Sequence, residues 1–502
     1  MFQSTSYGRG IINSSLLNVL SKGLVFFVNL IIASTFGASI STDIYFFCYS
    51  CIILVVVFIS GITNGVIIPE YIHLSSIDGQ ETLASSFINR TLYFVISILS
   101  LVAVIVVIDP VTTLGFISNF KASTLEQERI LIILAIPVLV LQGTTTFFND
   151  ILVSKKYFTL PMIVALANSI LILSLVLLMG EDIGIKSIFI ANILAYLASL
   201  SFQIYLFRKY FNWNFLITSR AFNKLVFQNV ILVSSGWLTT SMSSYIPIFL
   251  LSKYSEGIIT ALNYGLRISE IPIAVFVMHV ANIILVKFTE LNAINQLKEL
   301  SDIFLRATKL LFMVLVPGSI LASLFSFDLT ILLFGRGAMD QGALKETSAF
   351  LKILVLATPF YAINILISKL FIAAKKIRIS VIYQIALNAA YIFLLFLFVD
   401  SMGPIGFAWA YLIYYSFNSI LILLFAKTQF AFFNIGKVAK YQLLIILLNI
   451  AIVAGLNGMF NYKVTNFSDI VVFIFSYLII YLTILGIVDN QIFSQLYSYI
   501  KR

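Results

Sequence analysis

The sequence contains few charged residues. Only 10% of its 502 residues are Asp, Glu, Lys or Arg, whereas 61% are hydrophobic, and the mean hydropathy is +1.05. A soluble protein of this length needs far more charged surface, so the composition excludes that class and indicates a polytopic membrane protein. The net charge of +10 lies in short basic segments between apolar runs. This pattern is typical of loops that face anionic lipid, so it does not indicate a nucleic-acid partner.

Cysteine and histidine are also scarce. Cys48 and Cys51 form a C-x-x-C pair on an apolar helix, and there is no second pair, so we predict no metal site. The only histidines, His73 and His279, are isolated, and we interpret both as structural. No Walker A sequence is present, which argues against transport driven by ATP hydrolysis on this chain. We therefore predict no catalytic residues, no cofactor and no enzymatic activity.

Long apolar runs fill the rest of the chain, and we predict an all-α fold with about 14 transmembrane helices. Basic residues concentrate in alternate loops, which predicts a multi-pass protein with both termini cytoplasmic. The expected spans are 11–36, 44–69, 85–109, 128–149, 158–180, 185–207, 226–251, 259–286, 304–326, 348–374, 379–399, 404–426, 440–460 and 468–488.

The chain also contains a long-range repeat. Lys155 precedes Asn168 at the same spacing with which Lys375 precedes Asn388, and the two sets are 220 residues apart. A weaker echo links Thr42 to Thr260, 218 residues later. Several matches at nearly one offset predict a parallel duplication, with a six-helix lobe at 1–220, a second at 221–430 and two additional helices at 431–502. Two such lobes usually enclose a central cavity with a substrate site near the membrane midplane.

The most informative charges lie inside an apolar run. Arg267 and Glu270 are three residues apart and therefore share one helix face. Charged residues within a membrane usually face a protein interior or an aqueous cavity. One interpretation is a structural ion pair that seals two helices or lies at the membrane edge. The other is a cationic site for an anionic substrate, in which Glu270 positions the arginine.

Other polar groups could line the same cavity. Lys22 and Asn29 are seven residues apart and share a face, although Lys22 could instead extend to the membrane surface or pair with Asp43. Lys369 is a further cation within a span, and it too could extend to the surface. If Lys22, Arg267 and Lys369 converge, the cavity is positive and suits a pyrophosphate, because phosphate accepts charge-assisted hydrogen bonds from Arg and Lys.

Several motifs resemble the MurJ/MviN family of the multidrug/oligosaccharidyl-lipid/polysaccharide exporter superfamily. The resemblance extends over nearly the whole chain. It rests on Phe36-Gly37-Ala38-Ser39 followed by Thr42-Asp43, on Tyr264-x-x-Arg267-x-x-Glu270-x-Pro272, on Phe334-Gly335-Arg336-Gly337-Ala338, on Lys369-Leu370-Phe371-x-Ala373 and on Gly403-x-x-Gly406.

This resemblance implies two six-helix lobes around a central cavity and two C-terminal helices that help to form a groove for a lipid tail. It also implies that Arg267, Glu270, Lys22, Asp43 and Lys369 line the cavity. Two places at which lipid II flippases of the family usually carry arginine hold Val28 and the apolar stretch 54–56 here. An exporter of O-antigen or exopolysaccharide units is therefore a competing expectation.

We predict a monomeric flippase that translocates an undecaprenyl-pyrophosphate-linked glycan, either lipid II or an O-antigen or exopolysaccharide repeat unit, by alternating access. Its partners would be this substrate, membrane lipid and a possible coupling cation. Two alternatives remain from the sequence: a cation-coupled multidrug exporter of the same superfamily, which acidic cavity residues would favour, and a membrane polymerase or ligase of glycan assembly, which would need clustered acidic or His residues outside the membrane.

Overall fold

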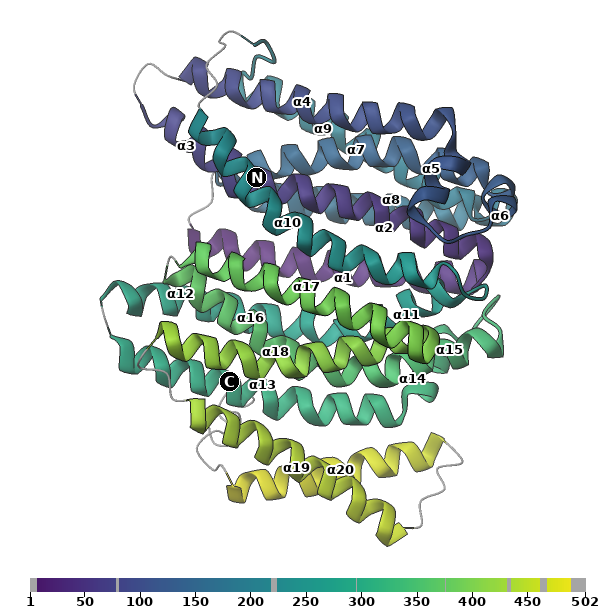
Figure 1. Ribbon diagram of the computed structural model, residues 1–502, viewed down its shortest axis with the longest axis vertical. Helices are drawn as coiled ribbons and strands as arrows, with labels where there is room; N and C mark the ends of the chain where they lie inside the picture. The colour runs from purple at the N-terminus through teal and green to yellow at the C-terminus, as the bar shows by residue number, and fades with distance from the viewer. Residues whose placement is uncertain are drawn as a thin grey trace. The chain divides into compact units, whose positions relative to one another are not determined.

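The structure is a computed structural model that describes residues 7–77, 81–217, 224–294, 296–374, 376–430, 435–460 and 467–488. Within these ranges the chain is α-helical and contains no β-strand (Figure 1). The predicted all-α membrane architecture is therefore confirmed. Arg220, Lys375 and the last fourteen residues, on which the predicted placement of the termini partly depends, lie outside the described ranges.

The chain divides into two compact units. Unit 1 comprises Met1–Tyr264, Leu333–Glu346 and Val381–Phe407. Unit 2 comprises Gly265–Leu332, Thr347–Ser380 and Ala408–Arg502. The predicted boundaries at 1–220, 221–430 and 431–502 describe a repeat in the sequence, which these compact units do not test, so they stay a prediction.

Unit 1 is a bundle in which α2 packs against α7 and α10, α7 against α4 and α9, and α8 against α1 and α9. Its helices are α1 (Tyr7–Phe36), α2 (Ile40–Ile62), η1 (Thr63–Ile67), α3 (Ile68–Ser75), α4 (Glu81–Ile108), α5 (Pro110–Ile117), α6 (Ala122–Gln127), α7 (Arg129–Ser154), α8 (Thr159–Ile183), α9 (Lys186–Phe211), α10 (Lys224–Leu251), the start of α11 (Ile258–Pro272) and most of α17 (Ile377–Met402) with η4 (Gly403–Ile405).

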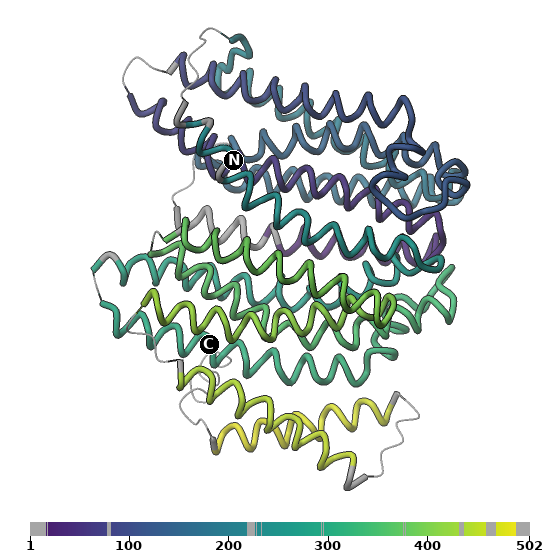
Figure 2. Tube along the Cα trace, viewed as in Figure 1, coloured from purple at the N-terminus to yellow at the C-terminus, as the bar shows by residue number. Residues whose placement is uncertain are grey.

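Unit 2 is built around α13, which packs against α12, α16 and α19, and α19 in turn packs against α20 (Figure 2). Its helices are the end of α11, η2 (Ile273–Val277), α12 (Met278–Ala293), α13 (Leu297–Leu324), α14 (Ser326–Phe334) up to Leu332, most of α15 (Gln341–Leu354), η3 (Val355–Ala357), α16 (Thr358–Ala373), α18 (Gly406–Gln429), α19 (Ile435–Phe460) and α20 (Phe467–Val488).

The described residues contain 12 helical segments that are long and apolar enough to cross a membrane, so the predicted number of 14 is not confirmed. Two predicted spans merge into the single segment Arg378–Gln429, because the turn η4 between α17 and α18 is itself helical. Another predicted span corresponds to α10, which is a full 28-residue helix. Its run of serine and threonine from Ser234 to Ser244 lowers its hydropathy, and α10 is not among the 12.

Two long helices contain a π-helical turn in their middle. The turn η1 follows α2 and precedes Pro69, and the turn η2 follows Pro272 at the end of α11. A proline within a helix removes one backbone donor and crowds the preceding turn, and such irregular turns are frequent at functional sites. The turn η2 begins three residues after Glu270, so the predicted charged pair lies beside this irregularity.

Candidate functional site

Asp43 binds the beginning of α11 from a neighbouring helix within unit 1. Its carboxylate accepts hydrogen bonds from the backbone nitrogen of Gly257 at 2.7 Å and of Thr260 at 2.8 Å. The Thr260 hydroxyl donates a third hydrogen bond at 2.6 Å. Asp43 is only 2% exposed. A carboxylate in this position caps the free N–H groups of a helix start and interacts favourably with the helix dipole.

The beginnings of α2 and α11 are each capped by a carboxylate from the other segment. Just as Asp43 caps α11, the side chain of Glu256 accepts a hydrogen bond of 2.8 Å from the backbone nitrogen of Ile40, at the start of α2. Thr42 and Thr260 lie between them with their hydroxyls 3.1 Å apart. These threonines are the pair that the 218-residue echo related, and residues beside an axis between two repeats are expected to meet in this way.

Glycines allow a third segment to join this contact. Gly37 ends α1 at a φ of +63°, and Gly337 lies in the loop after α14 at a φ of +67°. A Cβ atom at Gly337 would lie 2.0 Å from the carbonyl oxygen of Ser34, and one at Gly37 would lie 2.4 Å from that of Ala338. The nitrogen of Ala338 donates to the Ser34 carbonyl at 2.7 Å. We call residues 34–43, 255–260 and 334–338, all in unit 1, the turn junction.

The tyrosine of the 264–272 motif completes the turn junction. Tyr264 is fully buried, and its ring stacks on Phe334 with centroids 4.7 Å apart and meets the edge of Phe46 at 5.6 Å. Its hydroxyl donates a long hydrogen bond of 3.5 Å to the Gly37 carbonyl. Three of the motifs that carried the family resemblance are therefore one packed structure, although they are up to 300 residues apart in the sequence.

Arg267 and Glu270 lie on the part of α11 that belongs to unit 2. The Nη1 atom of Arg267 is 3.5 Å from the Oε2 atom of Glu270, as their spacing predicted. Their side chains are 37% and 51% exposed. A structural pair that seals two packed helices would be buried, so these exposed fractions argue against that form of the structural interpretation; a pair at the membrane edge and a substrate site both stay predictions. The single long contact leaves most of the guanidinium donors able to bind a ligand.

A cluster of tyrosines lies on α16 and α18 in unit 2. Tyr361 on α16 interacts electrostatically with Glu270. Its ring lies 4.6 Å from that of Tyr415 on α18, and Tyr411 and Tyr414 lie 4.6 and 4.9 Å from Tyr415. Tyrosine combines an apolar ring with a hydroxyl that hydrogen-bonds, so this tyrosine cluster can contact a polar head group.

Unit 2 also contains an apolar cavity of about 640 Å³. It lies between α13, α16, α18 and α19, and Phe360, which lines it, is the neighbour of Tyr361 in the chain. The last two helices are anchored beside it, since the Tyr481 hydroxyl donates to the Met313 carbonyl at 2.9 Å and the Tyr477 hydroxyl donates to Asn449. The cavity is lined by Val316, Ser319, Ile320, Leu356, Pro359, Phe360, Leu412, Ser416, Ile446, Ile450, Val453, Ala454 and Asn457.

Lys22 and Asn29 occupy different environments on α1. Lys22 is exposed, whereas Asn29 is 6% exposed and donates a hydrogen bond of 2.7 Å to the Val25 carbonyl of its own helix. That bond satisfies one amide hydrogen of Asn29 without any ligand. The predicted role of both residues in substrate binding stays a prediction.

Lys369 is half-buried on α16, two turns after Tyr361. It belongs to unit 2 with Arg267 and Glu270, whereas Lys22 and Asp43 belong to unit 1. The contacts within each unit do not test whether the three cations converge, so the common positive cavity also stays a prediction.

Sequence reasoning missed several residues of these sites. The partners of Asp43 are 214 to 217 residues away, and only the echo between Thr42 and Thr260 signalled the contact. The short spacing of Tyr411, Tyr414 and Tyr415 could have indicated the tyrosine cluster. The unit 2 cavity depends on four helices and has no local signal.

A family model described as lipid II flippase MurJ matches residues 32–479. The chain belongs to the lipid II flippase MurJ family. It is 22% identical to the probable lipid II flippase MurJ of Buchnera aphidicola subsp. Schizaphis graminum, over 94% of each chain. The probable lipid II flippase MurJ of Aquifex aeolicus is 26% identical over 214 residues, which are 41% of this chain and 40% of that relative.

Solved structures show the same fold. A lipid II flippase MurJ in an inward closed conformation superposes with a TM-score of 0.78 at 19% identity, over 95% of this chain and 99% of that chain. An inward-facing multidrug resistance MATE family transporter gives a TM-score of 0.68 at 12% identity, over 83% and 94% of the two chains. The MurJ family thus shares its fold with drug exporters, and the fold alone does not select between these substrates.

Proposed function

We propose that the chain is a flippase for an undecaprenyl-pyrophosphate-linked saccharide. Membership in the MurJ family, which is described as a family of lipid II flippases, supports this proposal. Within the molecule, the main support for this proposal is the half-exposed pair of Arg267 and Glu270 in unit 2. The same unit contains the tyrosine cluster, whose Tyr361 interacts with Glu270, and the large apolar cavity.

Arg267 binds the pyrophosphate in this proposal. A guanidinium group presents several donors in a planar fork that matches phosphate oxygens, and its charge is permanent. Glu270 holds the guanidinium in position while the site is empty and is displaced from it when the diphosphate arrives. Lys369 adds positive charge from α16, and the tyrosine cluster offers rings and hydroxyls to the saccharide.

The apolar cavity of unit 2 accommodates part of the polyprenyl chain. Its lining is almost entirely hydrocarbon, and α19 supplies several of the residues. This arrangement fits an amphiphile whose head contacts α11 and α16 and whose tail follows the last two helices. The tail remains in an apolar environment while the head group crosses in contact with polar side chains. These contacts avoid the cost of moving the charged head group through lipid.

The turn junction is the contact that alternating access must open. It joins α2 to the beginning of α11 through Asp43 and Glu256, and α11 is the helix that carries Arg267. We propose that it holds one end of the transport path closed while the head group binds. Opening it exchanges buried hydrogen bonds for contacts with water or substrate, so Asp43 acts on transport without contacting the pyrophosphate.

The test is a flipping assay in proteoliposomes loaded with a fluorescent undecaprenyl-pyrophosphate-linked saccharide. Wild-type protein is expected to flip the substrate, and Arg267→Ala to reduce the rate roughly 10- to 100-fold, because a hydrogen bond to a charged group contributes about 1.5–3 kcal/mol. Arg267→Lys keeps the charge and is expected to retain part of the rate. Equal rates for all three proteins would rule out the role assigned to Arg267.

The same assay separates the competing substrates. Lipid II is the first saccharide to test, and an O-antigen or exopolysaccharide unit on the same carrier is the second. Transport of both would indicate that the carrier pyrophosphate, rather than the glycan, is recognised. Assays with an imposed pH or sodium gradient test for the coupling cation. The proposal includes a monomer in the bacterial inner membrane with both termini cytoplasmic.

A further inference from the structure

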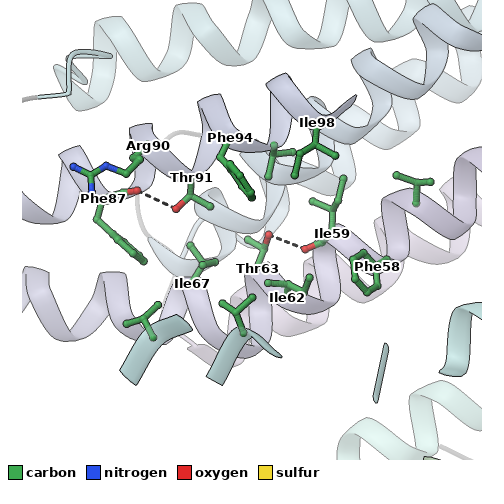
Figure 3. A pocket seen from close by; sticks show the side chains of 14 residues that line it. Phe58, Ile59, Ile62, Thr63, Ile67, Phe87, Arg90, Thr91, Phe94 and Ile98 are labelled. Atoms are coloured by element: carbon green, nitrogen blue, oxygen red, sulfur yellow. Dashed lines mark hydrogen bonds between the residues drawn. The ribbon is translucent and has the colours of Figure 1, made fainter. Parts of the chain in front are cut away.

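Unit 1 contains a second apolar cavity, of about 410 Å³, which the proposed transport path does not use. It lies between α2 with η1, α4 and α10. Figure 3 shows Arg90 at one end of the lining, beside Phe87, and two threonines, Thr63 and Thr91, among the apolar side chains of the rest. The cavity is lined by Val55, Phe58, Ile59, Ile62, Thr63, Ile67, Phe87, Arg90, Thr91, Phe94, Val95, Ile98, Val226 and Val230.

The two threonines of this lining do not make the cavity polar. The Thr63 hydroxyl donates to the Ile59 carbonyl at 2.8 Å, and the Thr91 hydroxyl donates to the Phe87 carbonyl at 3.0 Å (Figure 3). Their hydrogen atoms are thus directed to their own helices. An apolar cavity without convergent polar partners does not hold ordered water and instead accepts hydrocarbon.

Arg90 lies nearer to the beginning of α4 than to its end. It is nine residues after Glu81 in a helix of 28 residues, which at 1.5 Å per residue is about 42 Å long and therefore longer than a hydrocarbon core of about 30 Å. An arginine in the first three turns of such a helix can extend its side chain toward the lipid head groups.

An aromatic and basic cluster marks the membrane surface at this level. Asn89 accepts a hydrogen bond from the indole of Trp213 at 2.8 Å. The ammonium group of Lys155 lies 5.2 Å from the Trp213 ring, 5.3 Å from Phe211 and 5.6 Å from Tyr71. Trp, Tyr and Lys are typical of the boundary between lipid and water, so this end of unit 1 faces a head-group layer.

We propose that this cavity binds one acyl chain of an anionic phospholipid, whose phosphate contacts Arg90. The guanidinium group matches phosphate oxygens, and Lys155 beside Trp213 adds positive charge, which favours a lipid with net negative charge. At about 30 Å³ for a small group, the cavity holds on the order of a dozen methylene-sized groups. That capacity is close to the size of one fatty acyl chain and is only a small part of an undecaprenyl chain.

The experiment is native mass spectrometry of the full chain in detergent, with phosphatidylglycerol and phosphatidylcholine that carry identical acyl chains. The wild type is expected to bind phosphatidylglycerol about tenfold more tightly than phosphatidylcholine, because only the former keeps a net charge beside Arg90. Arg90→Gln is expected to abolish this preference and to leave the weaker binding of phosphatidylcholine unchanged. Arg90→Lys is expected to restore part of the preference.

A second pair of variants tests the acyl chain. Val95→Phe places a ring in the cavity and is expected to reduce the binding of both lipids. Val104→Phe is the matched control, because Val104 is on the same helix, is 55% exposed and does not line the cavity. The melting temperatures of both variants identify any folding defect, and Arg90→Gln decides the question if Val95→Phe does not fold.

The proposal would be overturned by equal binding of both phospholipids to the wild type or by unchanged binding to Val95→Phe. Tighter binding of undecaprenyl phosphate than of phosphatidylglycerol at this cavity would also overturn it. Inorganic phosphate at the same concentration is expected not to compete, since it lacks the acyl chain, and competition would also contradict the proposal. The site is independent of the proposed flipping, because binding is measured without transport.

Discussion

Two charged sites along α11, one formed by Asp43 of α2 and one by Arg267 and Glu270 of α11 itself, differ in almost every physical respect. At its beginning, in unit 1, the Asp43 carboxylate is 2% exposed and accepts three hydrogen bonds of 2.6 to 2.8 Å. Two turns later, in unit 2, Arg267 and Glu270 are 37% and 51% exposed and meet through one contact of 3.5 Å. The first site is complete in itself, whereas the second has unused capacity for hydrogen bonds.

This difference suits the two sites to different roles, one in holding helices together and the other in binding a ligand. A buried charge with all its partners present stabilises one arrangement of the helices and costs much to disturb. A half-exposed charge with one weak partner contributes little to stability, yet it can exchange that partner for a ligand. We infer that changes at the turn junction act mainly on stability and conformation, and that changes at Arg267 and Glu270 act mainly on substrate.

The largest expected effect follows from Asp43→Ala. The substitution leaves the buried N–H groups at the start of α11 without their acceptor, and we expect a loss of about 3–5 kcal/mol in the free energy of unfolding. Thermal unfolding of the purified protein in detergent measures this loss. Asp43→Asn keeps one acceptor oxygen and is expected to lose less. If Asp43→Ala does not change the melting temperature, the turn junction does not stabilise the protein as we propose.

Glycine substitutions test the tight packing of the turn junction. Gly337→Ala and Gly184→Ala both place a side chain at a φ of +67°, which costs about 1–2 kcal/mol. Only Gly337 faces a clash, with the Ser34 carbonyl oxygen 2.0 Å from the added Cβ, whereas nothing lies within 4 Å at Gly184. We expect Gly337→Ala to destabilise the protein by about 1–3 kcal/mol more, as overpacking does. Equal melting temperatures for the two variants would contradict this packing.

Glu270→Gln tests the other side of the comparison. The substitution keeps the size of the side chain and removes the charge that Arg267 contacts. Because an exposed ion pair contributes about 0.2–1 kcal/mol, we expect a loss of stability of no more than about 1 kcal/mol and a gain of up to about fivefold in pyrophosphate affinity. Competition of inorganic pyrophosphate with a labelled substrate measures the affinity. Weaker binding of pyrophosphate would show that Glu270 does more than hold the empty site.

The smallest effect is expected from Asp400→Asn. Asp400 accepts a hydrogen bond of 2.9 Å from Lys253, which raises the pKa of Lys253 above its ordinary value. The two side chains are 61% and 39% exposed, so we expect a loss of no more than about 0.5 kcal/mol in thermal unfolding. This variant is the control for Asp43→Ala, since both remove one carboxylate from unit 1. A large loss here would show that exposure does not distinguish the two sites.

Local patterns predicted much of the fold and one part of the site. Apolar runs located the long helices, and the three-residue spacing of Arg267 and Glu270 predicted their contact. The number of spans was less predictable, because the helical turn Gly403–Ile405 joins the expected spans 379–399 and 404–426 into one segment. Asp43 was predicted to line the cavity, which stays a prediction, and only the echo between Thr42 and Thr260 signalled its hydrogen bonds to the backbone of Gly257 and Thr260. Sites that depend on distant segments, such as both cavities, have no local signal.

The most direct test of the central claim compares flipping with folding in Arg267→Gln. The measurement is the rate of flipping per folded molecule in proteoliposomes, with the melting temperature of the same preparation. Our account predicts that flipping falls at least about tenfold while the melting temperature stays close to that of the wild type, because Arg267 is half-exposed and has one weak partner. Undiminished flipping together with a melting temperature as low as that of Asp43→Ala would contradict it.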